Sequence, residues 1–179
     1  MKRFVKLRIC LTIVLTCYII FGMFALTACG KLPFNAEWYC NADDWVSEDF
    51  MRNNKINAYY PNENYIEGES DPNEKYLQFK DMPSFRTFVI TEREKFKEIF
   101  LNYPNEVDFS SRVVILYIFG NIYPREYYLD DIILDGEVLK VYYGMEKSNV
   151  SDAMMPCPRC FMLITDKTEF KEVVFEEVS

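Results

Sequence analysis

The 179-residue chain contains no histidine. This absence excludes Ser-His-Asp and Cys-His nucleophile systems, which need an imidazole base, and it excludes HExxH zinc sites. It also removes the side chain whose ordinary pKa suits acid and base work near neutral pH. Any enzyme built from this sequence would need carboxylates, tyrosines, lysines or thiols, and the chain carries no catalytic motif of that kind.

Phosphate-binding glycine motifs and basic residues are also lacking. Neither GxGxxG nor GxxxxGK[ST] occurs, so nucleotide chemistry has no support. The 20 Lys and Arg are outnumbered by 28 Asp and Glu, and nucleic acids and anionic lipid headgroups both require a cationic face. We therefore expect no nucleic-acid partner. The 15 Phe and 13 Tyr indicate a folded core rather than a disordered stalk.

The first 28 residues have the pattern of an export signal. An apolar run over residues 9–26 ends in Leu26-Thr27-Ala28-Cys29, a lipobox. Ahead of the run stand four basic residues, Lys2, Arg3, Lys6 and Arg8. The arrangement resembles the signal peptides of bacterial lipoproteins. That resemblance implies cleavage after residue 28, lipidation of Cys29 and anchoring on the extracytoplasmic face of the cell membrane.

An uncleaved membrane-spanning helix is the alternative for this segment, since the apolar run has about the minimum length of 18 residues. Such a helix has no reason to end in small residues before a cysteine. Both alternatives keep the basic end inside and place residues 30–179 outside the cytoplasm. Cleavage leaves 151 residues with 16 basic and 28 acidic side chains, a formal charge of −12, which suits one domain of ordinary size.

Secondary-structure signals are weak before residue 75. We expect residues 29–74 to form a linker and a poorly patterned N-terminal segment, with one short helix from an Asp43 N-cap to about Arg52 and turns over residues 62–74. Residues 75–179 should form the domain. Strands are predicted over residues 76–80, 85–90, 112–119, 127–134, 137–143, 161–165 and 171–175.

One helix is predicted over residues 92–102. Thr91 and Glu94 have the spacing of a capping box at its start, and Pro104 lies beyond its end. One face is apolar, made by Phe96, Ile99, Phe100 and Tyr103. The expected fold class is α+β, a mostly antiparallel, curled β-sheet packed with this one main helix, in which the apolar run 112–119 is a central strand buried on both faces.

Asp135-Gly136 predicts a β-hairpin between the strands 127–134 and 137–143. A two-residue turn at these positions would place Asp131 opposite Lys140 and Ile132 opposite Leu139. The same register puts Tyr128 and Tyr143, with Ile132 and Leu139, on the core face.

Short apolar motifs accompany the predicted strands of residues 85–177. They are Val107-Asp108-Phe109-Ser110, Phe119-Gly120, the Asp-Gly hairpin, Pro158, and Lys167 with Val173-Val174-Phe175 beyond it. These motifs and the order of elements are similar to the C-terminal domain family of PrcB, a lipoprotein subunit of a surface protease complex. The sequence departs from the family at Arg125-Glu126-Tyr127, where a Gly-Tyr pair often opens the hairpin. The resemblance implies a partner-binding or complex-stabilising role without catalysis.

The motif Cys157-Pro158-Arg159-Cys160 is compatible with a redox dithiol, half a zinc site or a structural pair. Zinc fits poorly, because the chain has no histidine and Cys40 is the one other thiol of the folded domain. A thioredoxin-type centre needs a helix N-terminus, whereas the sequence after Cys160 is strand-like. We expect a turn disulfide or two semi-buried thiols, with Cys40 able to pair with either. No metal or cofactor is expected.

Two further groups of residues are candidates for surface roles. Three acidic pairs, Asp43-Asp44, Glu48-Asp49 and Asp130-Asp131, lack the spacing of a calcium loop and are expected to be solvated charges. Adjacent residues of a strand face opposite sides, so the tyrosines around the hairpin cannot all be buried. The exposed members should form an interaction surface; the candidates are Tyr123, Tyr127, Tyr128, Tyr142 and Tyr143.

These observations favour a non-enzymatic binding or accessory module that acts on another envelope protein. One alternative is a thiol-redox or chaperone-like protein that uses Cys157 and Cys160. A second alternative is a small-ligand-binding lipoprotein, which would need an apolar pocket with a few convergent polar groups.

Overall fold

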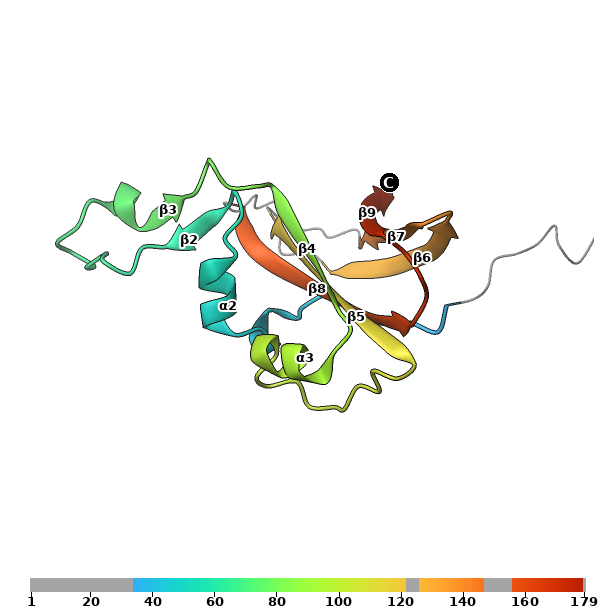
Figure 1. The fold of residues 1–179 in the computed structure, drawn as a ribbon. Coiled ribbons are helices and arrows are strands. Elements are labelled where there is room, and N and C mark those ends of the chain that lie inside the picture. The colour runs from blue at the N-terminus through green and yellow to red at the C-terminus, as the bar shows by residue number, and fades with distance from the viewer. Residues whose placement is uncertain (1–33, 122–125, 147–155, 179) are drawn as a thin grey trace, which may run out of the picture. The chain divides into compact units, whose positions relative to one another are not determined.

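The computed structural model describes residues 34–121, 126–146 and 156–178 (Figure 1). The expected signal peptide with Cys29, and also Tyr123, lie outside the described residues. The described part consists mainly of strands, and all but one of the strand pairings are antiparallel. The predicted mostly antiparallel pairing is therefore confirmed, in a fold that is rich in β-strands and has few helices.

Strand β5 is the centre of the larger sheet. This sheet is antiparallel throughout, and its strand order is β1 (Glu37–Tyr39), β8 (Cys157–Asp166), β5 (Arg112–Asn121) and β4 (Phe85–Ile90). Every residue from Val113 to Phe119 is buried, which confirms the expected central strand. A three-stranded sheet contains β6 (Tyr127–Asp135), β7 (Val138–Met145) and β9 (Glu172–Val178), and a two-stranded ribbon contains β2 (Tyr59–Pro61) and β3 (Tyr76–Gln78).

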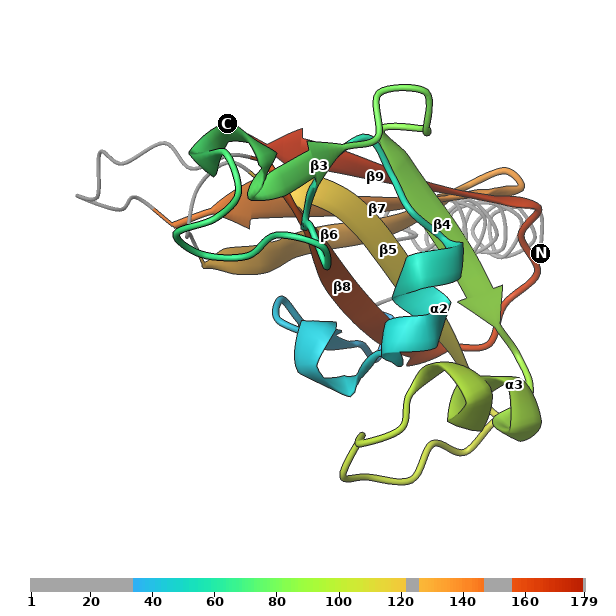
Figure 2. The ribbon, with the colours of Figure 1, turned by 90° about the vertical axis from the view of Figure 1, so that its left-hand side faces the viewer.

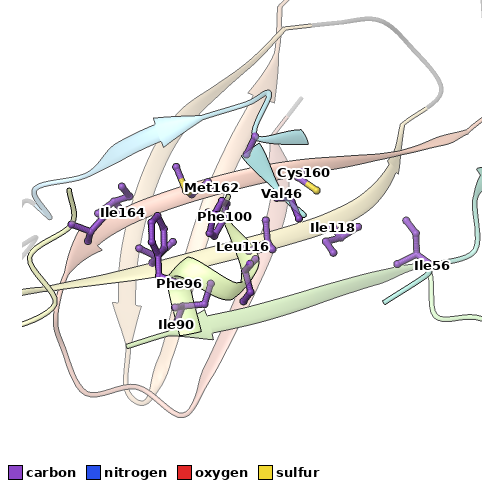
Figure 3. Packing of buried hydrophobic residues seen from close by; sticks show 14 of the residues in the cluster. Val46, Ile56, Ile90, Phe96, Phe100, Leu116, Ile118, Cys160, Met162 and Ile164 are labelled. Atoms are coloured by element: carbon purple, nitrogen blue, oxygen red, sulfur yellow. The ribbon is translucent and has the colours of Figure 1, made fainter. Parts of the chain in front are cut away.

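The two faces of the larger sheet are covered by different elements. Side chains alternate along a strand, so Leu116 and Met162 pack on one face with Val46, Phe96 and Phe100 (Figure 3). The opposite face carries the other members of β5 and β8 and packs against the three-stranded sheet. The side chains buried there are Ile115, Tyr117, Phe119, Phe161 and Leu163 from the larger sheet and Ile132, Leu139, Val141 and Tyr143 from the smaller one.

The helix expected from Asp43 to Arg52 is interrupted. It forms as a 3₁₀ turn, η1 (Asp43–Trp45), and a helix, α2 (Glu48–Asn53), because Val46 between them is extended and bridges Phe100. Ser47 caps α2 by accepting a hydrogen bond from the Phe50 amide on its side-chain oxygen. Tertiary pairing thus overrides the local helical pattern.

Helix α3 (Arg93–Ile99) lies inside the predicted range 92–102 but is shorter. Its N-cap is Glu92 with no side-chain cap bond, so the expected capping box from Thr91 is wrong. It ends at Ile99 because Phe100 takes an extended conformation to pair with Val46. The expected apolar stripe is correct for Phe96, Ile99 and Phe100, which are all buried.

The segment before residue 75 contributes more to the fold than its sequence suggests. The compact unit begins at Phe34, β1 pairs with β8, and Ala42, Ile56 and Ala58 are fully buried. Residues 34–58 therefore contribute to the sheet and core, although their sequence predicts a linker and a poorly patterned segment with one short helix. The 3₁₀ turn η2 (Pro72–Glu74) lies in the predicted turn region.

The predicted register of the hairpin is wrong, because the turn lies one residue further along the chain than predicted. The turn residues are Gly136 and Glu137, so Ile132 lies opposite Val141 and Ile133 opposite Lys140. Gly136 has φ +63°, which fits a type II′ turn with glycine at its first central position. A register shift lies between Leu129 and Asp131. Residues of β6 before this shift therefore face the side opposite to the predicted one. As a result Tyr128 points outward, whereas Leu139 and Tyr143 are buried as predicted.

Candidate functional site

The Cys-Pro-Arg-Cys motif lies within strand β8, not in a turn. Residues three apart in a strand face opposite sides and are about 10 Å apart, whereas a disulfide needs Cα atoms within about 7 Å. Cys157, Cys160 and Cys40 are all free. The strand therefore does not bring the CxxC sulfurs together. Cys157 is half-buried, and Cys160 is fully buried rather than semi-buried.

Cys160 sits in the core under α2. Its sulfur lies 3.7 Å from the Met51 sulfur, and burial, with the nearby Asp43 carboxylate, raises the pKa of the thiol. A protonated, buried thiol is a poor nucleophile. The geometry expected of a redox pair, an exposed first cysteine at a helix start, is not found in β8.

Asp43 fastens the chain after β1 to the outer edge of β8. Its carboxylate accepts hydrogen bonds from the Cys160 amide and, at 2.8 Å, from Nη1 of Arg159. The Ala42 amide donates to the Cys160 carbonyl at 3.1 Å, so both backbone groups of Cys160 are satisfied where β1 has ended. Burial raises the pKa of Asp43, and the Arg159 charge opposes that rise. The Asp43 side chain thus holds η1 against β8.

We expect Cys160→Ser to lower the free energy of unfolding by about 1–3 kcal/mol, because it places a hydroxyl in an apolar site. Cys157→Ser should cost less than about 1 kcal/mol, since its side chain is half-buried. Urea denaturation of both variants measures the difference. Equal losses, or insulin reduction by the wild type at a rate comparable to thioredoxin, would contradict a purely structural role for the pair.

Two of the three acidic pairs converge on one recess of about 520 Å³. Asp43, Asp44, Glu48 and Asp49 line it together with Leu101 and other residues, whereas Asp130-Asp131 lies away from it on β6. In the described ranges no group of three or more Cys, Asp or Glu side chains is placed to hold a metal ion. The convergence arises from the packing of η1 and α2, which the sequence spacing alone did not indicate.

The tyrosines of the hairpin divide between core and surface. Tyr127 and Tyr143 are buried, and Tyr127 donates a hydrogen bond from its hydroxyl to Oδ1 of Asn121 at 2.8 Å; these two are core residues, not interaction residues. Tyr142 is half-buried. Tyr128 is 45% exposed, and its ring covers Gly144 on the neighbouring strand so closely that a Cβ there would displace the ring. Tyr128 is thus the best-exposed candidate of those described.

A cavity of about 350 Å³ lies between α3 and the segment that follows it. It is lined by Arg93, Phe96, Lys97, Phe100, Leu101, Tyr103, Asn105, Glu106, Val107 and Phe109. The sequence pattern of this helix predicts its apolar stripe, but as part of the core alone. The missed signal is the pair of basic residues four apart, Arg93 and Lys97, beside that stripe.

Strand β4 leaves one edge of the larger sheet open. It pairs with β5 on one side, and no other described strand pairs with its outer side. Phe85 and Val89 on this strand are 56% and 45% exposed. The Phe85 ring lies 5.7 Å from Tyr117, which stacks at 4.2 Å on Phe175 of β9. An apolar seam therefore runs from the open edge of β4 to β9, the edge strand of the smaller sheet; both strands are visible in Figure 2.

Within the described ranges, no helix combines the length and the apolar character needed to cross a membrane. Comparison of the chain with protein-family models, with curated protein sequences and with solved structures returned no match.

Proposed function

We propose that the chain is a membrane-anchored, extracytoplasmic lipoprotein that acts as a non-enzymatic binding or accessory module for another envelope protein. The observation that carries the proposal is the open edge of β4 with its exposed Phe85 and Val89. Unpaired edge strands are templates for an added strand from another chain, and peptide recognition by strand addition combines backbone hydrogen bonds with pockets for alternate side chains.

The chemistry of the seam favours an extended partner segment that carries both apolar and basic residues. Apolar side chains of that segment would cover Phe85 and Val89. The other border of the seam, β9, exposes the carboxylates of Glu172, Glu176 and Glu177, which would attract cations and steer association. The resemblance to the PrcB C-terminal domain adds the finer proposal that the partner is an envelope protease. The periodicity of the sequence supports a second finer proposal, that the sheet is curled against α3 as its main helix.

The test is a crosslinking pull-down from native envelopes with the full-length chain. A charge in the middle of an edge blocks strand addition, so Val89→Lys should lose a specific partner that the wild type captures. Ile66→Lys is the matched control, since Ile66 is an apolar residue of similar exposure outside β4. Tyr128→Ala tests the outward face of the smaller sheet in parallel.

Capture of one envelope protein by the wild type and by Ile66→Lys, but not by Val89→Lys, supports the proposal. Loss on Tyr128→Ala alone would move the contact surface to β6. Equal capture by all variants would exclude both surfaces. Absence of any partner, together with turnover of a substrate by the purified chain, would show that the protein belongs to a different functional class.

Lipidation is tested independently of the partner. We expect the wild type to fractionate with membranes and to have the mass of the chain from Cys29 onward plus acyl groups, because the lipobox directs modification of that thiol. Cys29→Ser should accumulate as the full-length precursor without acyl groups. Intact mass spectrometry decides the matter: an unacylated wild type that retains residues 1–28 would instead support the uncleaved spanning helix.

A further inference from the structure

We infer that the cavity beside α3 is a binding site for a small amphipathic carboxylate, with an apolar or aromatic body inside and the anion at Arg93 and Lys97. This inference goes beyond the proposed protein-binding role and does not depend on it, since the cavity and the β4 edge share no residue.

The inner wall of the cavity is aromatic and already ordered. Phe96 and Phe100, labelled in Figure 3, are buried and stack on each other at 4.7 Å. Phe96 also contacts Phe109 and Tyr103, each with ring centroids 5.6 Å away. A preformed aromatic wall lowers the cost of ordering on binding. The volume of about 350 Å³ lies in the range of pockets that hold small organic ligands.

The polar groups of the cavity favour an anion. Arg93 and Lys97 are one helical turn apart, both are exposed, and neither forms an ion pair with any other described residue. Lys95, on another side of the same helix, differs in being paired with Glu98 at 2.9 Å. Two unpaired cations beside aromatic side chains are unexpected in a chain with a net charge of −8.

The nearby carboxylate of Asp108 is engaged by hydrogen bonds in its own turn and forms no ion pair with Arg93. Asp108 follows the cavity residue Val107, but its carboxylate accepts hydrogen bonds from the Ser110 amide at 3.0 Å and from the hydroxyls of Ser110 and Ser111 at 2.6 and 2.9 Å. Those bonds, and to a smaller degree the Arg93 charge, lower the pKa of Asp108, and the bonds hold its carboxylate in its own turn. Glu106 is the one acidic residue that lines the cavity.

The lining therefore carries one net positive charge, which matches a monoanion. The Arg93 guanidinium can hold a carboxylate through two parallel N–H···O bonds, and Lys97 adds a second donor. The aromatic wall selects a ligand body of one or two rings or a short acyl chain. A neutral ligand of the same shape would leave both cations unpaired.

The probes that test this are naphthalene-1-acetate and its neutral isostere naphthalene-1-acetamide. Equilibrium dialysis measures their binding to the full-length chain in detergent micelles, with empty micelles as the blank. We expect one site that binds the acid about tenfold more tightly than the amide, since bonds to ionised groups are roughly that much stronger. Arg93→Gln with Lys97→Gln should remove this preference and leave binding of the amide unchanged.

The matched control is Lys80→Gln with Lys95→Gln, which changes the net charge equally at exposed positions that do not line the cavity. It should bind the acid as the wild type does. Circular dichroism verifies that both double variants are folded. Equal affinities for acid and amide, no binding of either probe, or an equal loss of acid binding in the control would each overturn the inference.

Discussion

Replacing Phe161 with alanine should lower the free energy of unfolding by about 3–5 kcal/mol, the range for truncation of a fully buried aromatic residue. Phe161 is fully buried on β8 between the two larger sheets. Its ring centroid lies 4.4 Å from that of Phe119 on the same sheet and 5.1 Å from that of Tyr143 on the other. The alanine would leave a cavity among rigid rings that cannot collapse to fill it.

Thermal and urea denaturation measure the effect, which corresponds to a fall in Tm of about 2–4 °C for each kcal/mol. Phe85→Ala is the matched control, because it makes the same chemical change at a ring that is more than half exposed. It should cost less than about 1.5 kcal/mol. Similar losses for the two variants would mean that Phe161 is not the aromatic centre between the sheets.

The strands that are best predicted from the sequence are those whose own pattern of apolar residues indicates how they are buried. Val113 to Phe119 is an unbroken apolar run, so burial on both faces follows from the run alone. Phe85–Ile90 is predicted with its observed bounds. By contrast β1 is three residues long and has no periodicity to detect. It forms because its residues pair with β8, a strand that lies far away in the sequence.

The hairpin shows how little is needed to change a register. Asp-Gly is compatible with a turn that has glycine at its second central position, as predicted, and with one that has glycine at its first, as found at Gly136. The bulge after Leu129 then reverses which side of β6 faces the core. Neither choice is encoded by apolar alternation, and the bulge alone turns Tyr128 outward, since Ile132, Leu139 and Tyr143 keep their predicted core face.

The candidate sites depended on tertiary structure in the same way. The CxxC spacing suggested a turn, yet Cys157 and Cys160 lie on opposite faces of a strand because Pro158 is accommodated within β8. In the sequence Arg93 and Lys97 are only charged residues of an amphipathic helix, outside its apolar stripe. They became part of a cavity because the chain returns past α3 through Val107 and Phe109, a path that no local pattern specifies.

Trp38→Ala is expected to cost about 2–4 kcal/mol of unfolding free energy, a large effect for a residue in a segment with the sequence character of a linker. The indole is half-buried, packs 4.6 Å from Phe161 and donates a hydrogen bond from Nε1 to the Tyr127 carbonyl at 3.1 Å. It thus connects β1 of the larger sheet to β6 of the smaller one. Removing it deletes an aromatic contact and leaves a carbonyl without its donor.

Trp38→Phe separates the two contributions, because it keeps a ring against Phe161 and loses only the indole donor. It should cost about 1 kcal/mol, so urea denaturation should rank the wild type above the phenylalanine variant and that variant above the alanine one. Hydrogen exchange of the β1 amides should quicken in the same order, since β1 is held by β8 on one side and by this side chain on the other. An alanine variant as stable as the wild type would mean that residues before Cys40 do not contribute to the core, and the linker assignment would then be correct for them.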